Sequence, residues 1–168
     1  MAIAVCPGSF DPVTMGHVDI VTRASRLFDK VYVAVMKNPA KTPAFSAEER
    51  KALLSKALKG IENIEIITFD GLLVDLAAEK DATVIVKGLR AVSDYEYEFQ
   101  MALANHKLNS NVETVFLTTS SENMFLSSST VKQIACFGGE IRGLVPDCVC
   151  EDIKERLYLG GRVENGKK

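Results

Sequence analysis

The stretch Cys6–His17 joins a short apolar run to a helical pattern, and it constrains the fold more than any other part of the chain. The run Ala2–Cys6 leads into it and the pattern Val18–Phe28 leads out of it. A strand that ends in a glycine-containing turn and restarts as a helix is where α/β proteins hold phosphates, because backbone N–H groups and the positive helix N-terminus point at the ligand. The stretch has neither the Gly-x-Gly-x-x-Gly fingerprint nor the Gly-Lys-Ser/Thr of a Walker loop. It offers the hydroxyl of Ser9 and the imidazole of His17 instead.

Apolar runs along the chain predict five β-strands. They are Ala2–Cys6, Val31–Met36, Ile64–Phe69, Thr83–Lys87 and Thr114–Leu117. Several are nearly continuous rather than alternating, as in parallel strands buried on both faces. Helical patterns lie between them, which indicates βαβ units with right-handed crossovers. The predicted fold is therefore α/β, a Rossmann-like, doubly wound, five-stranded parallel sheet with C-terminal helices.

Helix boundaries are predicted from apolar stripes and from capping sequences. Ser46–Glu49 and Ser93–Glu96 both have the spacing of a capping box, which predicts a helix start at each. Further helices are predicted over Val18–Phe28, Leu72–Glu79, Ser127–Phe137 and Asp147–Tyr158. We expect the chain of 168 residues to form a single domain over residues 1–159, followed by a flexible C-terminal tail over residues 160–168.

The charge balance limits the classes of partner. A formal net charge of −2 gives no bulk attraction to nucleic acid or to an anionic membrane, so phosphate binding has to be local. No uncharged apolar run approaches the ~20 residues that a membrane span needs, and the N-terminus lacks a signal-peptide pattern. We expect a cytoplasmic protein with neither nucleic-acid nor membrane partners. The four cysteines are expected to be reduced thiols, because Cys148-x-Cys150 lacks metal-ligand spacing and has no histidine nearby.

Polar residues gather directly after the predicted strands, where parallel sheets bind their ligands. Lys41 follows the second strand, and Lys87-Gly88-Leu89-Arg90 overlaps the end of the fourth strand and continues beyond it. Brought to one rim, Lys41, Lys87 and Arg90 would form a local cationic pocket suited to a polyphosphate or to two phosphorylated ligands. Ser127–Thr130 begins a predicted helix, whose free N–H groups would face an anion.

These residues also have ordinary structural explanations. The explanations are a backbone-bonded helix start for His17, a turn for Ser9, a solvated loop for Lys41, a helix-dipole complement for Glu98 and a helix face for Leu73. The Lys87–Arg90 segment is harder to explain in this way, because charges that flank a glycine directly after a buried strand are unusual.

Two segments resemble a known signature. Gly8-Ser9-Phe10-Asp11-Pro12 followed by Thr14-Met15-Gly16-His17 resembles the nucleotidyltransferases that carry a His/Thr-x-Gly-His motif. The segment Lys87–Glu98 and the serine run Ser127–Ser129 make the resemblance more specific. With them, the chain closely resembles the bacterial phosphopantetheine adenylyltransferases over nearly its whole length. The resemblance implies that ATP and 4′-phosphopantetheine are joined into dephospho-coenzyme A and pyrophosphate, the penultimate step of coenzyme A biosynthesis. It also implies Mg²⁺ carried mainly by the ATP phosphates, a homohexamer and feedback inhibition by coenzyme A.

The resemblance assigns roles position by position. The catalytic positions would be Ser9, His17, Lys41 and Arg90. The ATP-binding positions would be Ser9, Phe10, His17, Gly88, Leu89, Arg90, Glu98, Asn123, Met124, Phe125, Leu126, Ser127, Ser128 and Ser129. The positions that contact 4′-phosphopantetheine would be Ser9, Lys41, Leu73 and Lys87. Because the phosphate of 4′-phosphopantetheine is already an anionic nucleophile, we expect in-line attack without a covalent enzyme intermediate.

Departures from the family pattern and rival functions stay open at this point. Ser9 stands where threonine is common, and Lys87 stands where arginine is frequent, which loses a bidentate fork. Asn123 stands where an aromatic residue is often found. The rivals are another transferase of the superfamily, acting on nicotinate mononucleotide or glycerol phosphate, a non-catalytic nucleotide-binding module, and a relic of a class I aminoacyl-tRNA synthetase.

Overall fold

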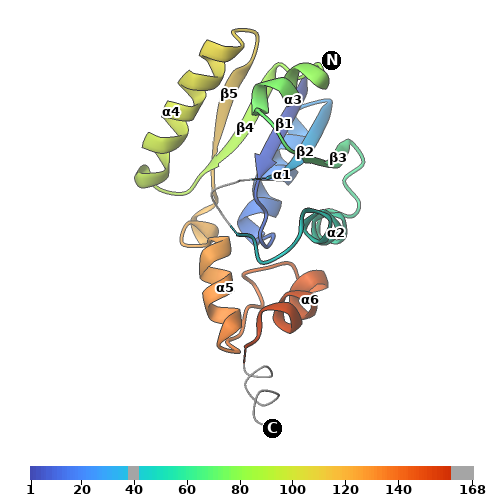
Figure 1. Ribbon diagram of the computed structural model, residues 1–168, viewed down its shortest axis with the longest axis vertical. Coiled ribbons are helices and arrows are strands. Elements are labelled where there is room, and N and C mark those ends of the chain that lie inside the picture. Colours follow the sequence, from blue (N-terminus) through green and yellow to red (C-terminus); the bar gives the residue numbers. More distant parts are fainter. Residues whose placement is uncertain (38–41, 160–168) are drawn as a thin grey trace.

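The computed structural model describes residues 1–37 and 42–159, and its core is a parallel sheet in the order β3-β2-β1-β4-β5 (Figure 1). The strands are β1 (Ile3–Gly8), β2 (Lys30–Met36), β3 (Ile64–Phe69), β4 (Val84–Leu89) and β5 (Glu113–Thr118). The order reverses between β1 and β4, which confirms the predicted doubly wound α/β sheet. All five strands lie where the apolar runs predict them.

The helices follow the strands in alternation and then continue alone at the C-terminal end. They are α1 (Met15–Leu27), α2 (Ala47–Ala57), α3 (Leu73–Glu79), α4 (Val92–Leu108), the 3₁₀ helix η1 (Ser121–Asn123), α5 (Ser128–Cys136) and α6 (Asp147–Leu157). Ser46 and Glu49 form the predicted capping box, and Ser127 caps α5 through the Thr130 N–H. Within the described ranges, no helix is long and apolar enough to cross a membrane.

The predicted capping box at Ser93–Glu96 is wrong. Helix α4 begins at Val92, and its N-cap is Ala91, which makes no side-chain capping bond. Ala91 has an extended backbone, and its carbonyl accepts from the Asp94 N–H at 3.1 Å. The helix therefore starts two residues earlier than a box led by Ser93 allows.

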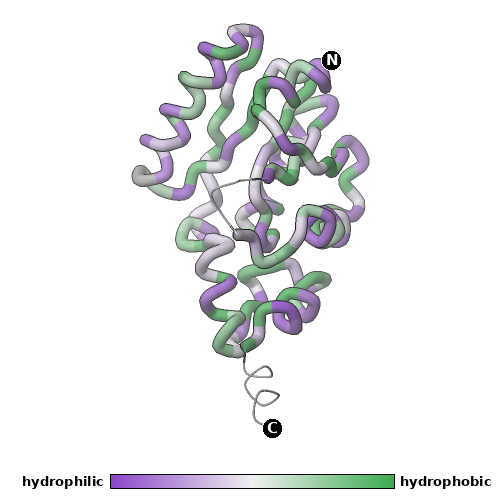
Figure 2. The backbone as a smooth tube through the Cα atoms, viewed as in Figure 1, coloured by the Kyte–Doolittle hydropathy of each residue, from purple (hydrophilic) through white to green (hydrophobic). Residues whose placement is uncertain are grey.

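Helices cover both faces of the sheet, and each face has its own apolar cluster. On one face, Ala4, Cys6 and Val33 pack with residues of α1, α2, α5 and α6. On the other face, Val5 and Ala34 pack with α3. Neighbouring residues of β1 thus point to opposite faces, and both faces are apolar, as buried parallel strands require. Figure 2 shows the resulting hydrophobic colouring along the central strands.

The sheet opens at its carboxyl end between β1 and β4. The β1–β2 ladder runs from Ile3 to Gly8, but the β1–β4 ladder holds only Ala4 and Val5 opposite Val84 and Ile85. Beyond this point the two strands diverge, at the place where the strand order reverses. Helices α5 and α6 lie beyond this end of the sheet (Figure 1), and α/β sheets bind ligands outside the carboxyl ends of their strands where the order reverses.

Candidate functional site

His17 is fixed at the start of α1 by a reciprocal cap. The Thr14 side chain accepts from the His17 N–H, and the Thr14 N–H donates to His17 Nδ1 at 3.0 Å. Nδ1 is therefore an acceptor, and in the neutral ring the proton sits on Nε2. The helix thus presents a single oriented N–H donor, together with its own positive N-terminus.

The surroundings of His17 keep its ring neutral. Burial, reinforced by the positive charge of Arg90, lowers the pKa of His17 from 6.5 to about 4. Its ring also meets the Phe10 ring edge-on, with centroids 5.0 Å apart. At neutral pH the free protein therefore holds a neutral imidazole beside a guanidinium, which suits hydrogen-bond donation to an anion.

Phe10 is buried against Gly8 in a strained turn. The backbone of Phe10 has φ of 48°, in the left-handed region that is uncommon for an aromatic residue. A Cβ at Gly8 would lie 2.8 Å from the Phe10 ring, so only glycine lets the ring fold back over the end of β1. Strain of this kind is typical of functional sites. Here it places the Phe10 ring against His17.

The three segments that carry the resemblance meet in space. Arg90, just after β4, donates from Nη1 to the Leu126 carbonyl at 2.9 Å, next to the N-cap of α5. Ser128 donates from Oγ to the Pro12 carbonyl at 2.8 Å. Gly16 lies within 3.8 Å of the Asn123 side chain, measured from the position that a Cβ would take. Residues more than a hundred positions apart in sequence therefore form one site.

Lys87 and Arg90 are each paired with a carboxylate of α4. Lys87 Nζ lies 3.1 Å from Glu98 Oε2, and both side chains are at most a quarter exposed. Arg90 holds Asp94 with two contacts, Nε to Oδ2 at 3.0 Å and Nη2 to Oδ1 at 3.2 Å. Lys87 thus lies within the last half of β4, Arg90 directly follows the strand, and each cation is neutralised by an acidic side chain of α4.

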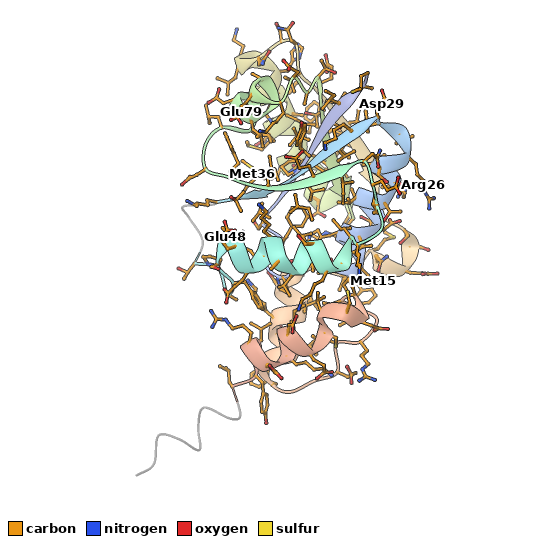
Figure 3. The ribbon with its side chains drawn as sticks, turned by 90° about the vertical axis from the view of Figure 1, so that its right-hand side faces the viewer. Met15, Arg26, Asp29, Met36, Glu48 and Glu79 are labelled. Carbon is orange, nitrogen blue, oxygen red and sulfur yellow. The ribbon has the colours of Figure 1, made fainter. Side chains whose placement is uncertain are left out.

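A cavity of about 690 Å³ lies beyond the carboxyl ends of β1 and β2. The predicted residues Ser9, Ser128 and Ser129 line it. Figure 3 shows this end of the molecule from the side, with the labelled Met36 at the end of β2 and Glu48 at the start of α2. The remaining lining residues are Asp11, Met36, Lys37, Thr42, Pro43, Ala47, Arg50, Asp70 and Lys132.

Asp11, Arg50 and Lys132 are charged, line this cavity and were not assigned a role from the sequence. Asp11 is buried, pairs with Lys132 at 2.8 Å and accepts from the backbone N–H groups of Ala44 and Phe45. Its burial alone would raise the pKa of the carboxyl, but the hydrogen bonds from Lys132 and the backbone lower it below its usual value. Arg50 is buried too and donates to carbonyls, with Ser9 O at 2.6 Å the nearest.

Sequence signals for these three residues exist in hindsight. Asp11 lies inside the first motif, and Lys132 lies one helical turn after the serines of α5. Arg50 shares a helix face with Leu53 and Leu54, where a charge facing the core indicates a special role. Their contacts, however, join distant segments, which periodicity does not reveal.

The remaining predicted residues are placed as follows. Gly88 and Leu89 end β4, and a Cβ at Gly88 would meet Ile20 of α1 at 3.0 Å. Met124 and Phe125 are exposed after η1, whereas Leu126 is buried. Leu73 begins α3 and packs with the apolar cluster on the α3 face of the sheet. Lys41 lies outside the described residues.

The acidic side chains of the cavity are engaged with lysines. Asp11 pairs with Lys132, and Asp70 pairs with Lys37 at 2.9 Å. Over residues 1–37 and 42–159, no group of three His, Cys, Asp or Glu side chains could hold a metal ion. Mg²⁺ commonly binds through substrate phosphates and one or two carboxylates.

Comparisons of the sequence with known proteins show the family of the chain. The family model described as cytidylyltransferase-like matches residues 5–134. The chain is 57% identical over 153 residues to the phosphopantetheine adenylyltransferase of Clostridium tetani, covering 91% of this chain and 96% of that protein. It is also 57% identical over 157 residues to the phosphopantetheine adenylyltransferase of Caldanaerobacter subterraneus subsp. tengcongensis, covering 94% of this chain and 98% of that protein.

A solved structure supports the fold alone. The putative nicotinate-nucleotide adenylyltransferase of Vibrio parahaemolyticus superposes with a TM-score of 0.66 at 17% identity. The superposition covers 95% of this chain and 98% of the other. At 17% identity the comparison shows a shared fold and carries no information about the reaction or the acceptor.

Proposed function

This chain belongs to the cytidylyltransferase-like family and, within it, to the phosphopantetheine adenylyltransferases, and from that premise we propose that it transfers the adenylyl group of ATP to 4′-phosphopantetheine. The products are dephospho-coenzyme A and pyrophosphate, and the reaction is the penultimate step of coenzyme A biosynthesis. The observation that carries the proposal is the 690 Å³ cavity beside the strand-order reversal, lined by Ser9, by the start of α5 and by basic side chains. It offers room and charge for phosphorylated ligands.

The reaction is a direct displacement at the α-phosphorus of ATP. An oxygen of the 4′-phosphopantetheine phosphate forms a bond to this phosphorus, and the bond to the β-phosphate oxygen breaks. The electron pair leaves with pyrophosphate. Because the nucleophile is already an anion, the enzyme needs no strong general base. The obstacles are alignment and repulsion between anions, so positioning, worth ~7–11 kcal/mol, and charge stabilisation supply the rate.

His17 stabilises charge at the α-phosphate as a neutral donor. Its Nδ1 is occupied by the Thr14 N–H, so Nε2–H is the group that faces the ligand. The N-terminus of α1 and the Ser9 hydroxyl add to this stabilisation. Arg90 and the N-terminus of α5 at Ser127–Ser129 receive the leaving pyrophosphate. Mg²⁺, which arrives as part of the MgATP substrate, shields the phosphate charges.

The acceptor and the nucleotide occupy adjoining parts of the site. Lys41 and Lys87 hold the phosphate of 4′-phosphopantetheine, and Leu73 lies along its pantetheine arm. The nucleotide contacts Phe10, Gly88, Leu89, Arg90 and Glu98, together with the segment 123–129. Coenzyme A, which shares the product's chemistry, inhibits by occupying the same site. The location that we propose is the cytoplasm, a reducing compartment that suits four free cysteines.

The assembly that we propose is a homohexamer, and helix α4 supports an association of copies. Among the α4 side chains that the structure describes, Asn105 is the one that is buried. Six large apolar side chains of α4 are exposed, namely Tyr95, Tyr97, Phe99, Met101, Leu103 and Leu108. In Figure 2, α4 mixes hydrophobic and hydrophilic positions along its length. Such a face suits a subunit interface better than open water.

An acceptor panel tests the function. Purified protein is supplied with MgATP and either 4′-phosphopantetheine, nicotinate mononucleotide or glycerol phosphate, and pyrophosphate release is followed. We expect release with 4′-phosphopantetheine alone. Pyrophosphate release with another acceptor would show that the protein is a different transferase of the family. No pyrophosphate release with any acceptor would favour a nucleotide-binding module.

A further inference from the structure

One face of α4 holds two cations at the carboxyl end of β4, Lys87 within the strand and Arg90 directly after it. Asp94 and Glu98 are four residues apart, so their side chains lie one above the other on the helix. Glu98 pairs with Lys87 and Asp94 pairs with Arg90. The charges proposed to bind substrate anions are therefore already neutralised by the protein's own carboxylates.

The two pairs differ in what they leave for a ligand. The Arg90 guanidinium has five N–H donors in a fixed fork, so it can keep Asp94 and the Leu126 carbonyl and still donate to a phosphate. The Lys87 ammonium is a compact point charge on a flexible stem. The ammonium has three N–H donors but only one positive charge. A phosphate and the Glu98 carboxylate beside it would repel each other across that one charge, so the two anions compete for Lys87.

Glu98 has a second use once a nucleotide is present. A carboxylate does not bind phosphate, but a carboxylate beside a bound nucleotide commonly accepts from the ribose hydroxyls. Contact with the ribose would draw Glu98 from Lys87. The side chain can therefore serve either the lysine or the nucleotide.

We propose that Glu98 is a built-in competitor for Lys87, which weakens binding of 4′-phosphopantetheine until ATP takes Glu98 onto its ribose. This proposal rests on the proposed function and assigns Glu98 a regulatory contact beyond its place in the ATP site. Because coupling between two binding sites is reciprocal, 4′-phosphopantetheine on Lys87 equally frees Glu98 for ATP. The enzyme thereby favours the complex that holds both substrates over either half-filled complex.

The test is Glu98→Gln, measured by calorimetric titration of 4′-phosphopantetheine without nucleotide. Glutamine keeps the size of the side chain but removes the charge that competes for Lys87. We expect 4′-phosphopantetheine to bind about 2- to 5-fold more tightly, as the loss of a partly screened ion pair implies. The same variant should bind ATP more weakly, because the ribose loses its anionic acceptor. Asp94→Asn is the matched control, and it should not tighten 4′-phosphopantetheine.

The affinities of the two ligands for Glu98→Gln should change in opposite directions, and this distinguishes a Glu98 that competes for Lys87 from one that only holds Lys87 in place. If Glu98 merely held Lys87 in place, Glu98→Gln would weaken both ligands, and that result overturns the inference. Unchanged binding of 4′-phosphopantetheine overturns it too. Lys87→Gln provides a second check, because it frees Glu98 for a ribose. Adenosine, which has a ribose but no phosphates, should therefore bind this variant more tightly than the wild type. Weaker or unchanged adenosine binding contradicts the competition. A wild-type protein that neither binds 4′-phosphopantetheine nor releases pyrophosphate would overturn the function as well, whereas an active wild type with the wrong Glu98→Gln result overturns the inference alone.

Discussion

His17 combines a fixed tautomer with a depressed pKa. The Thr14 N–H occupies Nδ1, and burial beside Arg90 disfavours the charged ring. A general base would need a free, basic nitrogen, and this histidine offers neither. The geometry therefore favours a donor that stabilises charge in the transition state, consistent with a nucleophile that needs no deprotonation.

Replacing His17 by alanine should lower kcat by about 10²–10³-fold, because one preorganised donor to the developing charge is removed. The Kd of ATP should change far less, since the other contacts to the nucleotide remain. Steady-state kinetics and equilibrium titration of ATP measure the two effects separately. Unchanged turnover in His17→Ala would remove the histidine from the mechanism.

The depressed pKa of His17 also predicts how stability depends on pH. Above pH 6.5 the histidine is neutral in both the folded and the unfolded chain. Between pH 6.5 and about 4, the unfolded chain binds a proton that the folded chain excludes, so the free energy of unfolding falls as the pH falls. The loss amounts to roughly 2–3 kcal/mol at ~1.4 kcal/mol per pH unit.

Urea unfolding at pH 7.5 and pH 5 measures this loss. His17→Gln should reduce the difference between the two pH values, because glutamine does not titrate. His106→Gln, which replaces the chain's other histidine, is the matched control for the loss of an imidazole elsewhere in the chain. An equal difference in wild type and His17→Gln would show that burial does not hold this ring neutral.

At the scale of elements, the end of β1 is built around contact between a glycine and an aromatic ring. Gly8→Ala would place a methyl group 2.8 Å from the buried Phe10 ring. We expect a loss of about 1–3 kcal/mol in the free energy of unfolding, as for other overpacked sites, together with lower activity because Phe10 contacts His17. Thermal unfolding and turnover measure the two effects.

Gly16→Ala is the matched control for stability in the same motif. The nearest atom to a Cβ at Gly16 is 3.7 Å away, an ordinary contact, and Gly16 lies within α1. Alanine should therefore leave the free energy of unfolding unchanged or raise it by up to about 1 kcal/mol through helix propensity. If both variants lost stability equally, the packing of Phe10 over Gly8 would not be the reason for glycine at position 8.

The sequence predicts elements well where a local pattern determines them. Strand β3 matches its apolar run, and α2 and α5 begin at their predicted caps. The predicted start of α4 was wrong because the helix follows an extended Ala91, which is its N-cap and makes no side-chain capping bond. The ion pair of Asp11 with Lys132 joins segments that lie far apart in the sequence, and the α4 carboxylates pair with cations at the end of β4. The sequence shows these residues in motifs or at helical spacing, but it does not show which residues they pair with.

At the scale of the whole molecule, α4 predicts association between copies. Leu103→Glu places a charge on the exposed apolar face and should shift the protein from an assembly toward the monomer, because an unpaired charge buried in an interface is costly. Light scattering after size-exclusion chromatography measures the mass. Phe137→Glu changes a side chain after α5 that is even more exposed, 82% against 57% for Leu103, and should leave the mass unchanged. A wild-type monomer at micromolar concentration would contradict the assembly.

The most direct test of the central claim is rapid-quench measurement of pyrophosphate release from MgATP, with and without 4′-phosphopantetheine. A direct transfer between substrates predicts release only when 4′-phosphopantetheine is present, with one dephospho-coenzyme A formed for each pyrophosphate. Release equal to the amount of enzyme in the absence of acceptor would reveal an adenylylated enzyme and contradict direct displacement. Absence of release when both substrates are present would contradict the activity itself.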